Sequence, residues 1–534
     1  MAKQARRRKQ PKILWEVSNR KRAEEGVAGC CPAEDKKCKT ISGCVDAEAR
    51  IESFSCAALS CIGDALFWLA SLVMRMNTNP NFETARPMSR RDFLKTSSAA
   101  ASAAALGVGC RSTTPQKSAP TAAAAAVGLT VERAAHAAGS DVLKVGMIGC
   151  GGRNSGAAVQ ALAADRGARL VAMCDIFRER IEAKREEIKK VGGDQVQVDH
   201  EHCFTGFDGY KGVIEASDVV LIANAAKFHP FHAMAALQAG KHVFVEKPHG
   251  IDPMGAKLMQ QACEVAKEKN LCLVSGLQSR FHAGYIETVN RIREGAIGDI
   301  VTLEENFLRA PYGIVERKAG LSELEWQCST QYHFRWLSGD DVPQSLVHNM
   351  DRASWVLGNQ RPVKCHGLAG RSSMTEPVYG DVFDHHSVVY EFENGVRVYA
   401  LCRTTTGCYD EDSSLIFGTK GKASVKACRI WGETNWRWQR RCDPYQVEHD
   451  KLFAAIRCGS ALNCGEYMAQ STMITIMGQL SCYTGKELTW EQINQSNFHY
   501  PPKPDECHDG MEPPTQPDSN GSYPVPLPGK MQWS

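Results

Sequence analysis

The sequence has 534 residues, enough to bury more than one hydrophobic core, so we expect two domains with additional segments. Its composition, 43% hydrophobic and 23% charged, excludes a chain that is disordered throughout. The formal net charge of +3 is nearly balanced over this length and gives no support for a nucleic-acid partner, which normally requires a basic stripe.

The 22 cysteines are unevenly distributed along the chain. Six precede residue 62, and the other sixteen are scattered singly, several of them inside apolar runs. None after residue 80 has the paired CxxC spacing of a zinc site. We therefore expect mostly buried free thiols and no metal site.

The first part of the chain carries no pattern of a folded domain. Residues 57–74 form an apolar run of 18 residues, but the run includes Asp64 and is marginal as a membrane span. We interpret residues 1–87 as an over-extended start or a disordered segment, with Met76 or Met88 as the initiator. The alternative is a genuine membrane anchor or a cysteine-rich appendage.

An export motif follows. Residues 89–95 read Ser-Arg-Arg-Asp-Phe-Leu-Lys and precede a weakly apolar stretch rich in Ala and Ser. This order resembles a twin-arginine (Tat) signal, in which a receptor reads the arginine pair. We assign residues 88–140 to the signal and a linker, and expect export to the periplasm with the twin-arginine translocase as a transient partner. The competing interpretation is a chance basic pair before an Ala-rich helix.

Folded sequence begins with the pattern of a dinucleotide-binding unit. An apolar run of strand length is followed by Gly149-Cys150-Gly151-Gly152-Arg153-Asn154-Ser155-Gly156 and then by a helical pattern. Gly149 permits the tight turn, and Gly151 lets the backbone approach a pyrophosphate bound at the helix N-terminus. We predict that Gly152, Arg153 and Asn154 also contact the cofactor, although Asn154 occupies the third glycine position of the fingerprint.

The second strand, 169–174, ends at Asp175, which lies 24 residues after Gly151. A carboxylate at this position accepts hydrogen bonds from the adenosine ribose and repels a 2′-phosphate, so we expect NAD as the cofactor. Arg178 is close enough to weaken this preference, and NADP stays open as an alternative. The competing interpretation of Asp175 is a turn or helix-capping residue.

Two further strands end in polar residues. The segment 217–223 is continuously apolar from Val219 onwards and fits a parallel strand covered on both faces, and the next strand ends in Glu246-Lys247-Pro248. Ligands bind at the carboxyl ends of parallel strands. The predicted cofactor-binding residues here are therefore Asn224, His229, Glu246 and Lys247. Lys247 is also well placed to meet a substrate beside a nicotinamide.

Together these segments resemble the Gfo/Idh/MocA family, whose namesakes include glucose–fructose oxidoreductase and inositol dehydrogenase. The similarity runs from about residue 142 to residue 488 and includes the Glu-Lys-Pro motif and the segments 276–280 and 348–358. It implies an α/β protein: an N-terminal Rossmann domain over residues 141–275, then an α+β domain over residues 276–490 with an open, mainly antiparallel sheet. It also implies a carbohydrate or cyclitol substrate and a homo-oligomer.

The resemblance implies roles for individual residues. Lys247 matches a lysine near the nicotinamide and the reacting hydroxyl, and His348 matches a histidine that acts as acid/base. Many members have an aspartate four residues before this histidine, where this chain has Gln344; Asp351 or a water would substitute, or the chemistry differs. A histidine suits proton transfer and an ammonium stabilises an alkoxide, but a packing role for His348 is the competing interpretation.

Strand patterns dominate the second domain, with a hairpin turn at Glu393-Asn394-Gly395. Helices near 448–457 and 466–484 are expected to close this domain. The Pro-rich tail, 491–534, is expected to be extended and available to wrap a neighbouring subunit.

Several polar residues of the second domain are candidates for substrate contact. They are Gln278, Arg280, Gln344, Asp351 and His385. The sequence Asp384-His385-His386 also suggests a metal site, but no third ligand is identifiable, so we expect none. The aromatic loop 326–336 is suited either to stacking on a sugar ring or to the core.

The sequence therefore predicts an NAD-dependent oxidoreductase that acts on a hydroxyl of a sugar, cyclitol or glycoside. Free NAD is scarce outside the cytoplasm, so we expect a cofactor that is loaded before export and tightly retained. Two alternatives stay open: an NAD-dependent glycosidase that oxidises the sugar transiently, and a non-catalytic sugar-binding relative.

Overall fold

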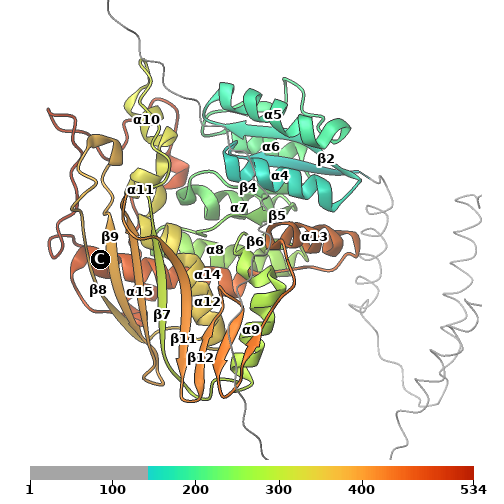
Figure 1. The fold of residues 1–534 in the computed structure, drawn as a ribbon. Coiled ribbons are helices and arrows are strands. Elements are labelled where there is room, and N and C mark those ends of the chain that lie inside the picture. The colour runs from blue at the N-terminus through green and yellow to red at the C-terminus, as the bar shows by residue number, and fades with distance from the viewer. Residues whose placement is uncertain (1–141, 534) are drawn as a thin grey trace, which may run out of the picture. The chain divides into compact units, whose positions relative to one another are not determined.

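The structure is a computed structural model that describes residues 142–533 (Figure 1). The predictions about the start of the chain, the apolar run 57–74 and the export signal fall outside this range. Among the described residues, no helix has the length and apolar character needed to cross a membrane. In the same range, no three or more His, Cys, Asp or Glu side chains are grouped so as to hold a metal ion.

The first domain contains a six-stranded sheet in which all neighbouring strands are parallel. In spatial order its strands are β3 (Cys203–Thr205), β2 (Ala168–Asp175), β1 (Leu143–Ile148), β4 (Val219–Ile222), β5 (His242–Val245) and β6 (Leu273–Ser275). The helices that connect them are α4 (Gly152–Ala164), α5 (Arg178–Gly192), α6 (Gly209–Ala216), α7 (His229–Gln238) and α8 (Pro253–Glu268). Because β4 is buried along its whole length, its continuous apolar sequence is explained by cover on both faces. The predicted Rossmann fold is confirmed.

The second domain contains a nine-stranded sheet. In spatial order its strands are β14 (Trp436–Arg437), β13 (Arg429–Gly432), β12 (Gly421–Ser424), β11 (Glu411–Gly418), β7 (Ile300–Arg309), β10 (Arg397–Thr404), β9 (His385–Glu391), β8 (Lys364–Gly370) and β15 (Leu488–Thr489). All neighbouring pairs are antiparallel except β7 and β10, so the predicted mainly antiparallel sheet is confirmed.

Helices cover one face of this sheet (Figure 1). The helices of the domain are α9 (Ala283–Arg293), α10 (Glu323–Ser329), α11 (Arg335–Ser338), α12 (Val347–Val356), α14 (Gly465–Thr484) and α15 (Trp490–Gln495). Strand β10 alternates buried and more exposed residues, with Val398 fully buried and Tyr399 exposed. This alternation is what a sheet covered on one face requires.

Helix α13 (Pro444–Arg457) was expected to close the second domain, but it returns to the first. Its residues Leu452 and Phe453 are buried in the same hydrophobic cluster as Leu162 of α4 and Phe244 of β5. The sequence pattern of an amphipathic helix does not specify which domain the apolar face covers, and this is why the prediction was wrong.

The Pro-rich tail packs against its own chain. Tyr500, Cys507 and Tyr523 are buried in one cluster with Phe228 of the first domain and Trp336 of the second. The tail is therefore largely irregular but is fixed by side-chain packing rather than projecting as a free arm.

Fifteen cysteines lie in the described range, and all of them are free thiols. Eleven of these are buried, in agreement with their apolar sequence surroundings. Burial raises the pKa of Cys150, Cys402 and Cys482 well above the usual value, so these thiols are poor nucleophiles.

Buried histidines make the fold sensitive to acid. Burial lowers the pKa of His232, His249 and His449 to about 3. The unfolded chain protonates these side chains near their ordinary pKa of 6.5, so below that pH the unfolded state binds more protons than the folded state. We expect the free energy of unfolding to fall as the pH drops from 6.5 towards 3, by up to about 1.4 kcal/mol per pH unit for each histidine. Urea unfolding at a series of pH values measures this slope.

His449 offers a selective control, because neither of its ring nitrogens has a hydrogen-bond partner and its ring packs against Phe244 at 4.4 Å. The substitution His449→Leu should therefore reduce the acid slope and leave stability near pH 8 little changed. A slope identical to that of the unaltered protein would contradict this assignment.

Candidate functional site

Two pockets meet at the carboxyl edge of the parallel sheet. They share Ala223, Asn224 and Gln331, and comprise about 1070 and 750 Å³ of empty space. Part of this space is open solvent, and the two pockets together extend from the Gly-rich turn to side chains of the second domain. The first pocket contains the Gly-rich turn and Asp175, and the second contains Lys247 and His348.

The Gly-rich turn has the geometry of a phosphate-binding loop. Gly149 has a φ of +90°, and a Cβ at this position would lie 2.8 Å from the main chain of Asn224. A Cβ at Gly151 would meet no atom within 4 Å, so this residue faces open space. Helix α4 begins directly after Gly151, with no side-chain cap and no acidic residue in its first turn. Its first amide groups are therefore available to a pyrophosphate, and the turn fits NAD.

Asn154 does not contribute its side chain to the pocket, which corrects the prediction. The side chain is fully buried, and its Nδ2 donates to the main-chain oxygens of Ile148, Gly149 and Leu221 at 3.0, 2.8 and 3.1 Å. It therefore fastens the turn to β1 and β4. Gly152, the first residue of α4, lines neither pocket.

Arg153 lines the second pocket rather than the first. Its guanidinium pairs with Glu246 at 2.5 Å and with Glu448 of α13 at 3.4 Å, and it lies 4.8 Å from the ring centroid of Tyr445. Glu448 is fully buried, and burial together with the nearby Glu246 raises its pKa. One guanidinium thus contacts Glu246, which lines the pocket, and the buried Glu448, which does not.

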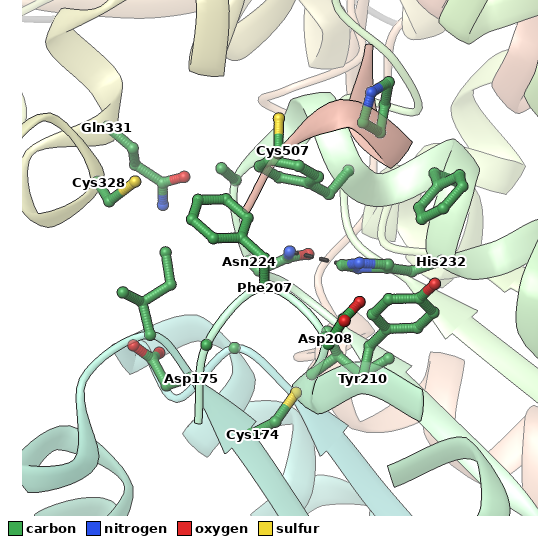
Figure 2. Close-up of a pocket in the computed structure, with 18 of the residues that line it drawn as sticks. Cys174, Asp175, Phe207, Asp208, Tyr210, Asn224, His232, Cys328, Gln331 and Cys507 are labelled. Atoms are coloured by element: carbon green, nitrogen blue, oxygen red, sulfur yellow. Dashed lines mark hydrogen bonds between the residues drawn. The ribbon is translucent and has the colours of Figure 1, made fainter. Parts of the chain in front are cut away.

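Asp175 lies at the end of β2 and lines the first pocket (Figure 2). Its carboxylate accepts hydrogen bonds from the main-chain N–H groups of Cys150 at 2.7 Å and Phe177 at 3.1 Å, and Arg180 lies 3.5 Å away. Arg178 does not line the pocket, since it donates to the main-chain oxygen of Cys203. The carboxylate is thus held where the adenosine ribose of NAD would lie.

Lys247 joins the first domain to the second. Its Nζ donates to the main-chain oxygen of Gln344 at 2.7 Å, within the π-helical turn Val342–Leu346 that precedes α12. The side chain of Gln344 instead donates to the main-chain oxygen of Ser338. The partner of the ammonium is therefore a neutral main-chain carbonyl and not a carboxylate.

His348 lies on the first turn of α12 and lines the same pocket as Lys247. Burial, reinforced by the ammonium of Lys247, lowers its pKa well below the ordinary value, so the imidazole is neutral near pH 7. Its Nδ1 is buried without a hydrogen-bond partner.

His229 and Asn224 support the junction of the two pockets. The ring nitrogens of His229 lie 2.8 Å from the main-chain oxygen of Pro248 and 3.1 Å from that of Asn224. His229 therefore ties together the two strand-end loops. Asn224 lines both pockets, and its buried Oδ1 has no hydrogen-bond partner among the described residues.

Only two of the five predicted substrate residues, Gln278 and Gln344, line the second pocket. Arg280 forms a buried ion pair with Asp351 at 2.8 Å, so Asp351 does not replace the missing carboxylate near Lys247. His385 is exposed at the start of β9, where it contacts Asp384, and it lies outside the pocket. These three predictions failed because the polar residues of a motif also serve structural ion pairs.

The sequence analysis missed Tyr445 of the second pocket, whereas Tyr332 belongs to the aromatic loop 326–336 that it singled out. Tyr445 accepts a hydrogen bond from Gln278 at 3.0 Å, and Tyr332 stacks on Tyr312 at 4.0 Å between ring centroids. The two roles predicted for the aromatic loop fall to different residues. Tyr332 is 37% exposed and lines the pocket, where it could contact a sugar ring, whereas Trp326 is buried in the core. No strand-end signal marks Tyr445, since it comes from α13, which is distant in sequence.

Comparison with known proteins identifies the class of protein to which this fold and site belong. Residues 143–275 match the family model described as "Oxidoreductase family, NAD-binding Rossmann fold". Fold and site thus define an NAD-binding oxidoreductase. Residues 285–424 match the "GFO/IDH/MocA C-terminal domain", and residues 87–107 match the twin-arginine translocation signal, which marks the chain for export to the periplasm. The chain belongs to the Gfo/Idh/MocA family, as its sequence predicted.

Curated relatives fall into two functional groups. A glycosyl hydrolase family 109 protein of Shewanella amazonensis is 28% identical over 346 residues, which cover 62% of this chain and 67% of the relative. Inositol 2-dehydrogenase of Salmonella typhimurium is 24% identical over 333 residues, which cover 59% and 87%. For two further family 109 relatives, from Shewanella, the coverage of the relative is 51%. The chain thus spans between half and two thirds of the length of these family 109 relatives.

Solved structures share the fold. Levoglucosan dehydrogenase in complex with NADH has a TM-score of 0.52 and 18% identity, covering 66% of this chain and 100% of that one. Aldose-aldose oxidoreductase from Caulobacter crescentus has a TM-score of 0.51 and 17% identity, covering 65% and 99%. At these identities the likeness concerns the fold alone.

The position of Asp175 predicts the choice of cofactor. The substitution Asp175→Asn removes the charge and frees Arg180 to bind a 2′-phosphate, but its single amide oxygen can accept from only one of the two main-chain N–H groups, of Cys150 or of Phe177. We expect the preference for NAD over NADP to fall by about tenfold or more in fluorescence titrations with both cofactors. Arg178→Ala is the control and should leave the preference unchanged. An unaltered preference in Asp175→Asn would contradict the assignment of this carboxylate to the ribose.

Proposed function

We propose that the protein is an NAD-dependent oxidoreductase that acts on a hydroxyl of a sugar, cyclitol or glycoside bound in the second pocket. The observation that carries this proposal is the meeting of Lys247 and His348 in one pocket, which shares Ala223 and Asn224 with the dinucleotide pocket. A nicotinamide that extends from the first pocket past Asn224 would reach both side chains.

The chemistry assigned to these residues follows from their surroundings. When bound, the nicotinamide supplies the hydride acceptor. The ammonium of Lys247, held by the carbonyl of Gln344, orients the substrate oxygen and stabilises the negative charge that develops on it. His348 is neutral and lines the pocket, so its imidazole can accept the hydroxyl proton. Because burial disfavours its cationic form, His348 is expected to hold this proton only briefly.

The remaining walls suit a polyhydroxylated ring. Tyr332 presents an aromatic face, and the side chains of Gln278, Gln331 and Tyr445 offer hydrogen-bond donors and acceptors around it. Apolar faces combined with a few oriented polar groups are typical of carbohydrate sites. The relative named inositol 2-dehydrogenase supports the same substrate class.

A glycosidase activity is the second candidate, because the family 109 relatives are named as glycosyl hydrolases. In that case the sugar hydroxyl would be oxidised transiently to a ketone, the aglycone would be eliminated, water would add to the resulting double bond, and return of the hydride to the ketone would leave the nicotinamide in its starting state. The brief retention of a proton by His348 is compatible with such a cycle. The non-catalytic alternative has less support, since both Lys247 and His348 are kept in the pocket.

A panel of sugars, cyclitols and aryl glycosides, mixed with the purified protein while nicotinamide absorbance is recorded, separates these functions. Net NADH formation supports the dehydrogenase, and aglycone release without a net absorbance change supports the glycosidase. Binding of a sugar with neither signal would favour the non-catalytic relative and overturn the proposal.

Substitution of the two central residues tests their roles. We expect Lys247→Met and His348→Asn each to lower kcat by about 100-fold or more, because each removes stabilisation of the reacting oxygen or its proton acceptor. Both variants should retain NAD, since the turn at Gly149 and Asp175 are unchanged. Lys190→Met, on the exposed end of α5, is the control and should keep full activity. Full activity in Lys247→Met would refute the proposed role of this residue.

A further inference from the structure

We infer that the segment 500–509 of the C-terminal tail, here called the tail strap, forms the outer wall of the adenosine half of the NAD site and slows the release of the cofactor. The inference rests on NAD binding to the first pocket and does not depend on which substrate is oxidised. It assigns a cofactor-binding role to a segment that the sequence analysis expected to extend towards a neighbouring subunit.

The tail strap is anchored at Tyr500 by two buried charged side chains. The Tyr500 main-chain N–H donates to Asp252 Oδ2 at 3.0 Å, and its oxygen accepts a hydrogen bond from Lys227 Nζ at 2.6 Å. Lys227 and Asp252 are only 4% and 5% exposed. A buried ammonium is costly unless it is hydrogen-bonded, so Lys227 strongly favours the position of Tyr500 seen in the structure.

A second attachment lies at the other end of the tail strap. Asp509 accepts a hydrogen bond from the main-chain N–H of Phe207 at 3.4 Å, in the loop between β3 and α6. The tail approaches this loop closely, since a Cβ on Gly206 would lie 2.3 Å from Asp509 Oδ2. The tail strap therefore connects the elements around α7 and α8 with the loop after β3.

Between these attachments the tail strap lines the first pocket. Pro504, Asp505 and Cys507 all contribute to the lining, together with Phe207 from the β3–α6 loop. Figure 2 shows Cys507 on the opposite side of the pocket from Cys174 and Asp175. The Gly-rich turn and Asp175 provide the inner wall at the sheet edge, and the tail strap provides the outer wall.

This arrangement has a direct kinetic consequence. A dinucleotide bound between the two walls contacts the tail strap with its adenosine half, so its departure requires the tail strap to move. Movement breaks the hydrogen bond of the buried Lys227 and the contact at Asp509. Local opening of the tail strap thus limits release, which is the property that an exported enzyme needs in order to keep a cofactor loaded in the cytoplasm.

The rate of NADH release measures this effect independently of catalysis. Full-length protein loaded with NADH is mixed with excess NAD, and the loss of bound-NADH fluorescence is followed by stopped flow. We expect release to accelerate by about tenfold or more in Lys227→Met, which removes the charged hydrogen bond to Tyr500. The exposed Asp509→Ala, which loosens the other attachment without touching a core, should also accelerate release.

Lys486→Met, an exposed lysine outside both pockets, is the matched control and should release NADH at the unaltered rate. If Lys227→Met does not fold, Asp509→Ala alone decides the outcome. Unchanged release in a folded variant with a loosened tail strap overturns the inference. If the variants release NADH faster but the protein acts on no sugar, the inference about the tail strap holds and only the proposed substrate class is refuted.

Discussion

The hydrogen bond between the ammonium of Lys247 and the main-chain oxygen of Gln344 is the contact on which the candidate active site depends. It joins the end of β5 in the first domain to the turn before α12 in the second. A charge-assisted bond of this kind is shorter and stronger than one between neutral groups, and it fixes a flexible lysine in one position. The same turn delivers His348 four residues later, so one local arrangement sets both groups that would face the reacting hydroxyl.

A second constraint holds the wall of the pocket. Arg153 lies in the Gly-rich turn of the first domain, yet it pairs with Glu246 beside Lys247 and with Glu448 from the returning helix α13. Burial raises the pKa of Glu448 and favours its neutral form, so the guanidinium compensates the charge of Glu246 and ties α13 to the dinucleotide domain through its contact with Glu448. The chain thereby brings Tyr445 and Glu448, which follow the whole second sheet in sequence, back to the edge of the first sheet.

The sequence was informative wherever a residue's position in a strand decides its role. Because the carboxyl ends of parallel strands meet at one edge, the positions of Asp175, Asn224 and Lys247 followed from the apolar runs alone. The reasoning failed where a polar side chain had two possible uses. Asn154 occupies the position of a fingerprint glycine but satisfies buried carbonyl groups, and the pairing of Arg280 with Asp351 is a tertiary contact that spacing does not reveal. The destination of α13 and of the tail depends on packing between segments distant in sequence, for which one sequence carries no local signal.

The buried cysteine thiols are relevant to the route by which the protein is exported to the periplasm. Disulfides form readily in the periplasm, where an unfolded chain with fifteen reduced cysteines in its globular part could cross-link in many wrong combinations. Passage through the twin-arginine route delivers a chain that has already folded, with eleven of these sulfur atoms enclosed; burial suppresses the ionisation of Cys150, Cys402 and Cys482 among them. The export pathway therefore protects these side chains, because oxidants meet a folded surface on which few sulfur atoms are accessible.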